Sequence, residues 1–137
     1  MSFTQSFEEG HHAAEWLLSE APGHQSRDVG TLKSGNNLPS GRVLGQITAT
    51  GKFTELDPAA GDGSQVAAGV LFANVDATAA DVAAVVISRG AEVKEALGLT
   101  NDLGTAFVTI TWKSGTTDPQ KAQARSELLA AGIVVRS

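Results

Sequence analysis

The sequence predicts a mainly β fold, a small barrel-like domain of the β-rich α+β type with short helices and an extended N-terminal arm. At 137 residues the chain has the size of one domain, and with 42% hydrophobic and 18% charged residues it can bury one core without disulfides or metal. Its apolar residues come in short runs separated by Gly, Pro, Asn and Asp, as in successive strands and turns. Aromatic residues make up only 5%, so the core depends on Val, Leu, Ile and Ala.

The N-terminal arm comprises residues 1–28, which differ in composition from the rest of the chain. This segment holds all three His residues, and its one strongly apolar stretch is Trp16-Leu17-Leu18. Ala21-Pro22-Gly23 interrupts any helix, because Pro lacks an N–H donor and Gly loosens the backbone. The segment is too short and too thinly apolar to fold alone. We therefore expect a flexible arm followed by a β-rich domain at residues 29–137.

Within the domain, strands are expected at the apolar runs and reversals at the Gly and Pro positions between them. Leu38-Pro39-Ser40-Gly41 and Thr50-Gly51 are typical turns, and Asp57–Gly63 is typical of a loop. Gly69 marks a bulge or a close backbone contact. The expected strands are Val29–Leu32, Val43–Ile47, Lys52–Leu56, Val66–Val75, Val82–Ile87, Phe107–Trp112 and Ile133–Val135.

Two helices are expected. The stronger one begins at Asp118 as the cap, with Pro119 at the first helical position, where its missing N–H costs nothing. Gly132 supplies its C-terminal stop. A shorter helix is expected at Ala91–Leu97, ending at Gly98.

Composition argues against several classes of partner and compartment. A net charge of −5, with the Lys and Arg residues scattered singly, argues against nucleic acid. Cys is absent, which removes thiolate catalysis and Cys-bound zinc. No apolar run approaches the ~18 residues of a membrane span. Because Glu8 and Glu9 stand where a signal peptide would be basic, we expect a protein made and kept in a cytosol-like compartment.

The residues also predict no catalytic site, no cofactor and no metal site, so the chain is not expected to be an enzyme. Every His (His11, His12 and His24) lies in the arm, which leaves a domain nucleophile without a base. Adjacent histidines on a helix point about 100° apart and cannot both face one metal ion. The Gly61–Ser64 loop lacks the Lys of a phosphate-binding loop.

Trp16-Leu17-Leu18 admits two interpretations, and the residues alone leave both open. The segment either folds back onto its own domain or docks on a partner, where Trp is favoured as a buried anchor. Trp112, at the end of an alternating strand, is expected in the core or in a subunit contact.

The chain resembles the lambda-type bacteriophage head decoration protein family in an ordered set of segments from about residue 10 to the C-terminus. Glu15–Glu20 and Ser26–Asp28 are similar to the arm of that family. The family's strand–turn–strand signature is matched by Ser34-Gly35 with Leu38, Gly41 and Val43-Leu44-Gly45. Leu99–Trp112 does not match its pattern. The remaining similar segments are Leu56–Ala60, Asp62–Leu71, Val75–Thr78, Val86–Arg89, Ala91–Val93 and Leu128–Arg136.

The resemblance implies a β-tulip fold without catalytic residues, assembled as a homotrimer. It also implies binding to the major capsid protein on the outside of the expanded head, where trimers hold neighbouring shell subunits together against DNA pressure. Synthesis would take place in the host bacterial cytoplasm. An arm of this kind can dock by adding a strand to a sheet edge of the shell, and three arms increase avidity. The expected docking residues are Phe7, Trp16, Leu17, Leu18, Ser19 and Arg27.

Three other functions remain as alternatives. Gly41-x-Val43-Leu44-Gly45 also occurs in small carrier or ligand-binding barrels, for which Lys52 is the candidate modification site. A receptor-binding protein of the virion surface is the second alternative. A small hydrolase, the third, would need a His inside the domain.

Overall fold

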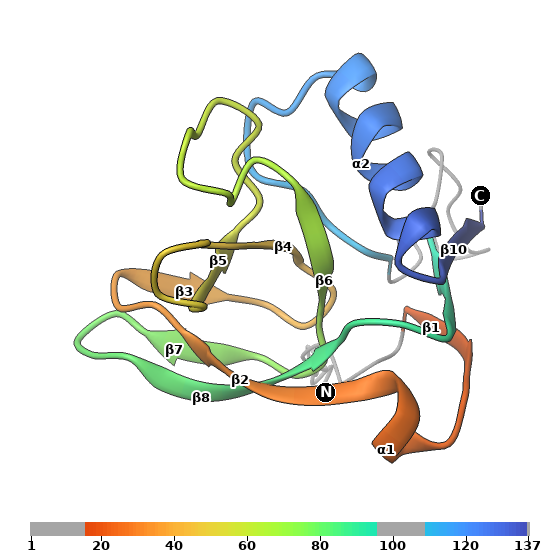
Figure 1. Cartoon of the computed structure of the whole chain (residues 1–137), viewed down its shortest axis with the longest axis horizontal. Coiled ribbons are helices and arrows are strands. Elements are labelled where there is room, and N and C mark those ends of the chain that lie inside the picture. Colours follow the sequence, from red (N-terminus) through yellow and green to blue (C-terminus); the bar gives the residue numbers. More distant parts are fainter. Residues whose placement is uncertain (1–15, 96–108, 137) are drawn as a thin grey trace, which may run out of the picture.

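The computed structural model describes residues 16–95 and 109–136, which form two helices and ten short strands (Figure 1). The helices are α1 (Gly23–Ser26) and α2 (Asp118–Ala130). The strands are β1 (Leu17–Glu20), β2 (Arg27–Leu32), β3 (Asn36–Leu38), β4 (Val43–Gln46), β5 (Phe53–Glu55), β6 (Ala67–Leu71), β7 (Val75–Ala77), β8 (Val82–Ile87), β9 (Ala91–Lys94) and β10 (Ile133–Arg136).

Five strands close into a barrel in the order β2-β5-β4-β6-β8. β2 completes the circle, because it pairs antiparallel with the whole of β8 and parallel with β5 at Leu32 and Phe53. Alternate residues of these strands point inward, as the two-residue period of a strand requires. They form one apolar core together with Leu38 of β3 and Ala77 of β7, which are paired in a separate two-stranded sheet. This core contains Leu32, Leu38, Leu44, Phe53, Leu71, Ala77, Ala84 and Val86.

A second core lies outside the barrel wall. There the three-stranded sheet β1-β9-β10 and helix α2 lie beside the barrel (Figure 1). Their buried side chains form one core with side chains of β6 and β8. β9 is the middle strand of that sheet, antiparallel to β1 and parallel to β10. This core contains Trp16, Val43, Leu56, Ala67, Val70, Ile87, Ala91, Val93, Ile110, Ala124, Leu128 and Ile133.

The mainly β, barrel-like fold class is confirmed, as are most of the expected strands. The runs at Val29–Leu32, Val43–Ile47 and Val82–Ile87 form β2, β4 and β8 within two residues of the expected bounds. Lys52–Leu56 and Ile133–Val135 correspond to β5 and β10.

Two expectations about secondary structure were wrong. Ala91–Leu97 was expected to be a helix, but Ala91–Lys94 is strand β9. Ala91 and Val93 are buried in the second core, and strand pairing on both sides of β9 outweighs the helical preference of Ala and Glu. The run Val66–Val75 is not one strand but two, since β6 ends at Leu71 and β7 begins at Val75.

The helix near the C-terminus is confirmed with its cap one residue earlier than expected. Thr117 is the N-cap: its hydroxyl accepts from the Gln120 N–H, and the Gln120 side chain accepts from the Thr117 N–H. Gly132, the expected stop, has a φ of +89°. In the expected strand Phe107–Trp112, residues 107 and 108 lie outside the described residues, and Thr111 forms an isolated parallel bridge with Arg42.

The close contact expected at Gly69 is present. A methyl group there would lie 2.6 Å from the Ile87 carbonyl oxygen, and the β4–β6 register shifts beside it, between Leu44 and Gly45. Gly69 therefore allows β6 and β8 to approach at the barrel wall.

Candidate functional site

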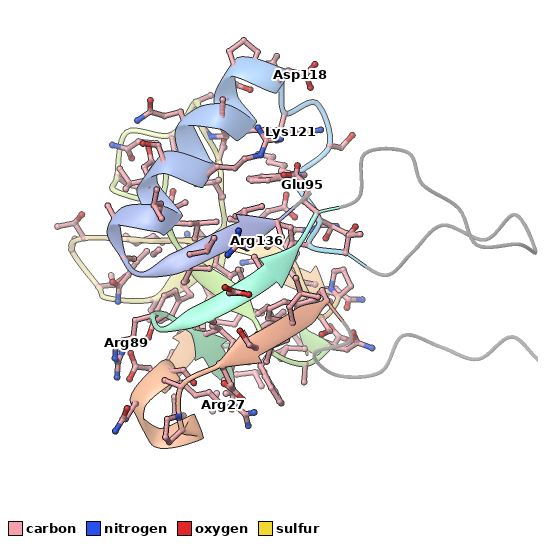
Figure 2. The ribbon with its side chains drawn as sticks, turned by 90° about the vertical axis from the view of Figure 1, so that its right-hand side faces the viewer. Arg27, Arg89, Glu95, Asp118, Lys121 and Arg136 are labelled. Atoms are coloured by element: carbon pink, nitrogen blue, oxygen red, sulfur yellow. The ribbon has the colours of Figure 1, made fainter. Side chains whose placement is uncertain are left out.

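The candidate site is the arm root, by which we mean the described part of the N-terminal arm, residues 16–28, and the residues that hold it. β1 and α1 precede β2 in this segment, and both pack on the domain. In Figure 2, β1, β9 and β10 lie side by side, with α2 beyond β10 and Arg27 beyond β1. Among the described strands, β1 is thus at the edge of its sheet.

Trp16 anchors the arm root to the domain. Its side chain is fully buried in the second core, and its indole Nε1 donates a 2.8 Å hydrogen bond to the Ser40 hydroxyl. Ser40 in turn donates to the Phe72 carbonyl oxygen at 2.7 Å, and its N–H donates to the Asn74 side chain. Gly41, with a φ of +90°, leaves the space for the ring, since a methyl group there would lie 2.7 Å from Trp16 Cδ1. The interaction joins the arm root to the turns before β4 and after β6.

β1 presents one side to the domain and another to solvent. Leu17 packs against the second core and pairs with Val93, whereas Leu18 is 50% exposed and Ser19 is exposed. The register shifts between Leu17 and Ser19, so Leu18 is an extra residue that bulges from the strand. The bulge directs an apolar side chain outward from the edge of the sheet.

A polar cluster closes the other end of the arm root. The Glu20 carboxylate accepts from the Ser26 hydroxyl at 2.6 Å and from Arg27 Nε at 3.1 Å, and a second Arg27 nitrogen pairs with its other oxygen. The Arg27 guanidinium also lies 4.1 Å from the centre of the Phe72 ring. Glu20 at the end of β1 is thereby fixed to the start of β2.

Acid should weaken the arm root, because hydrogen bonding to the Arg27 side chain lowers the pKa of Glu20 from its ordinary 4.5. A carboxyl group whose pKa is lower in the folded state stabilises the fold above its unfolded pKa and loses that contribution as the pH falls through its folded pKa. We expect the free energy of unfolding to decrease below about pH 4.5 and the decrease to be smaller in Arg27→Gln. Denaturant titrations across the acid range measure this.

Lys121→Gln is the matched control, because Lys121 forms no ion pair with the described carboxylates. Its acid dependence should equal that of the parent chain. An acid dependence in Arg27→Gln as steep as in the parent would contradict the role given to the Glu20–Arg27 pair.

The structure brings five of the six expected docking residues together, and the sixth, Phe7, lies outside the described residues. Trp16 and Leu17 contact the chain's own second core, so Trp16 is placed as the fold-back interpretation expects. Leu18 and Ser19 face solvent, and Arg27 is half-buried against Phe72. Sequence reasoning missed Ser40 and Phe72, which lie far along the chain from Trp16 and Arg27, their respective partners. It also missed Glu20, because the turn that brings Glu20 to Arg27 has no helical or strand spacing.

Two hollows of the described residues lie away from the arm root. One, of about 440 Å³, is lined in part by buried Glu95, which accepts from Arg125 Nε at 2.6 Å and from Trp112 Nε1 at 3.1 Å. A more apolar hollow of about 380 Å³ lies between α2 and the loop before β6. Lys52, the carrier candidate, is ion-paired with Asp81 at 2.6 Å.

Two further features are absent from residues 16–95 and 109–136. This part of the chain contains no cluster of three or more His, Asp or Glu side chains that could hold a metal ion. It also contains no helix of the length and apolarity needed to cross a membrane.

Comparison with known proteins identifies the family. No curated protein shows significant similarity to the chain. The family model of the bacteriophage lambda head decoration protein D, in contrast, matches residues 6–133, nearly the whole sequence, which confirms the resemblance. This family is structural rather than enzymatic and is associated with the phage capsid. The chain belongs to the bacteriophage lambda head decoration protein D family.

Proposed function

We propose that this head decoration protein binds the outside of the expanded phage head as a homotrimer. Each trimer would contact the major capsid protein of neighbouring shell subunits and hold them together against the pressure of the packaged DNA. The match of the family model over residues 6–133 carries this proposal. The chain would be made in the host bacterial cytoplasm, would act without catalysis, and would reside on the outer surface of the virion.

We further propose that the N-terminal arm forms the contact with the shell by strand addition. An edge strand offers unpaired backbone groups to a second chain, and β1 is such a strand within the part of the chain that the structure describes. Phe7, Leu18 and Ser19 would supply side-chain contacts. Trp16, Leu17 and Arg27 would support docking by fixing the base of the arm, because each of them contacts the domain.

The contacts that hold residues 16–28 on the domain lower the entropic cost of docking. Ordering a flexible segment on a partner costs conformational entropy, and every residue already held by the domain reduces that cost. Three arms on one trimer make the second and third contacts intramolecular. A single arm should then bind weakly, whereas a trimer should bind firmly.

Deletion of residues 1–15 tests the arm without removing its base. A cut later in the arm would remove Trp16 and destabilise the domain, so the deletion must end at residue 15. We expect the truncated chain to fold, to keep the mass of a trimer in light scattering, and to lose most of its binding to empty expanded heads in a co-sedimentation assay. The heads are assembled from the major capsid protein of the same phage genome.

Leu129→Ala in the full-length chain is the control, because Leu129 is an exposed apolar residue on α2, away from the arm root. It should bind heads like the parent. Full binding by the truncated trimer would overturn docking through residues 1–15, since β1 with Leu18 and Ser19 is the part of the arm that the deletion keeps. A monomeric truncated chain would mean that residues 1–15 act in assembly instead.

A further inference from the structure

The loop before β6 contains Asp62-Gly63, the one Asp-Gly step of the sequence. In such a step the glycine backbone nitrogen attacks the side-chain carboxyl carbon of the aspartic acid, because glycine has no side chain to block the approach. A bond between this nitrogen and Cγ forms, the bond from Cγ to the carboxyl OH breaks, and the OH leaves with the amide proton as water. Water then opens the resulting cyclic succinimide at either carbonyl carbon. The products are aspartate and isoaspartate, in which the backbone runs through the side chain.

The fold requires both residues of this step. Gly63 has a φ of +104°, and a methyl group there would lie 2.9 Å from the Gln46 carbonyl oxygen and closer still to the Thr48 hydroxyl. The Asp62 carboxylate accepts from the Ser64 N–H at 3.0 Å and from the Ser64 hydroxyl at 2.5 Å. Because Ser64 is buried, these bonds satisfy polar groups that water does not reach. A reactive pair of residues is therefore fixed at this position.

The peptide bond that joins the two residues is held at both of its polar atoms. The Gly63 N–H donates to Gln65 Oε1 at 2.8 Å. The carbonyl oxygen of the same peptide bond, on Asp62, accepts from the Thr48 N–H at 2.9 Å. Ring closure requires this peptide plane and the Asp62 side chain to rotate toward each other. The hydrogen bonds must therefore break before the nitrogen reaches Cγ.

The hydrogen bonds from Ser64 also lower the reactivity of the Asp62 carboxyl group. They lower the pKa of Asp62 from its ordinary 3.8, and the bond from the Ser64 hydroxyl is the largest cause. A carboxylate is a weaker electrophile than a protonated carboxyl group, because its negative charge repels the nucleophile. The reactive protonated form is therefore rarer at neutral pH than it is in an unperturbed aspartic acid.

We propose that Asp62-Gly63 is a latent modification site, at which spontaneous isoaspartate formation is suppressed by the contacts of Ser64 and Gln65. The reaction then proceeds only from molecules in which the loop has opened locally. Isoaspartate would add a backbone carbon next to Ser64, whose carbonyl oxygen packs against Gly45. The modified chain would therefore lose stability at the wall of the barrel. The site is separate from the arm root and does not depend on the proposed docking.

Gln65→Ala tests the protection, with Gln25→Ala as the matched control at an exposed position of α1. Gln65 is half-buried in a loop, so the variant should keep the fold, which circular dichroism checks. The full-length chains are incubated at neutral pH, and isoaspartate is located by mass spectrometry of the tryptic peptide Phe53–Arg89. We expect isoaspartate at residue 62 to form about fivefold faster in Gln65→Ala than in the parent, because loss of one hydrogen bond makes local opening more frequent. Gln25→Ala should match the parent.

The parent chain unfolded in guanidinium chloride gives the unprotected rate, which should be much higher than the rate in the folded parent. Equal rates in the folded and unfolded parent would overturn the proposal, and this comparison holds even if Gln65→Ala does not fold. A folded Gln65→Ala that reacts no faster than the parent would refute the protective role of Gln65. Isoaspartate that accumulates in the unfolded parent at other aspartates of the peptide, and not at Asp62, would refute the site itself.

Discussion

Replacing Trp16 by alanine is expected to lower the free energy of unfolding by about 3–5 kcal/mol, the range for removing a buried large aromatic side chain. The ring is fully buried between the barrel wall and the sheet β1-β9-β10, and its loss leaves a cavity that Gly41 cannot fill. Ser40 also loses the donor that its hydroxyl accepts from. Denaturant unfolding followed by far-ultraviolet circular dichroism measures the change.

Two variants test whether the loss of stability comes from removing the buried ring or from any substitution in this segment. Trp16→Phe keeps most of the apolar volume, so it should lower the free energy of unfolding clearly less than Trp16→Ala does, although it removes the hydrogen bond to Ser40. Leu18→Ala, two residues along and 50% exposed, should change the stability by less than about 1 kcal/mol. Equal and small effects at both positions would mean that Trp16 does not anchor the arm root.

The Trp16 variant also bears on docking. If the arm binds the shell only through its exposed residues, Trp16→Ala should weaken head binding in proportion to the fraction of arm roots that detach. Binding that fails completely while the domain remains folded and trimeric would instead assign Trp16 a direct contact with the shell.

Replacing Gly45 by alanine is expected to lower the free energy of unfolding by more than about 3 kcal/mol and to reduce the yield of folded protein. This decrease in stability exceeds the usual effect of an added methylene in a core. A methyl group at Gly45 would lie 2.2 Å from the Ser64 carbonyl oxygen and 2.7 Å from its Cα. Both are backbone atoms of the loop that leads into β6, so they cannot rotate away as a side chain would. The barrel must therefore separate β4 from this loop.

Gly61→Ala is the matched control for Gly45→Ala. Gly61 has no heavy atom within 4 Å of an added methyl group and does not have a positive φ. This substitution should be neutral or slightly stabilising, because alanine restricts the unfolded chain. A Gly45→Ala protein as stable as Gly61→Ala would show that β4 and the loop are farther apart than described.

Local patterns predicted the elements whose determinants lie within a few residues. The cap at Thr117–Pro119, the stop at Gly132 and the turn at Gly41 are decided by short-range backbone chemistry, and they stand within one residue of expectation. β9 was missed for the opposite reason. Its conformation is decided by β1 and β10, more than 35 residues away along the chain on either side.

In the arm root, too, local sequence and distant contacts decide different features. From the residues, Trp16-Leu17-Leu18 could either fold back or dock, because composition does not indicate which surface will bury an apolar side chain. Tertiary structure separates the members of the triplet: Trp16 is buried, Leu17 packs on the core, and Leu18 remains exposed on a bulge. The partners that produce this separation, Ser40 and Val93, are distant in sequence.

The sequence by itself determined the fold class, most of the strands, the C-terminal helix and the family, because these depend on composition, on hydrophobic period and on an ordered set of local motifs. Only the tertiary structure decided that the barrel closes between β2 and β5 and that Trp16 anchors the arm root in the second core. Such features follow from contacts between residues far apart in the chain. Their free energy is not a property of any local segment.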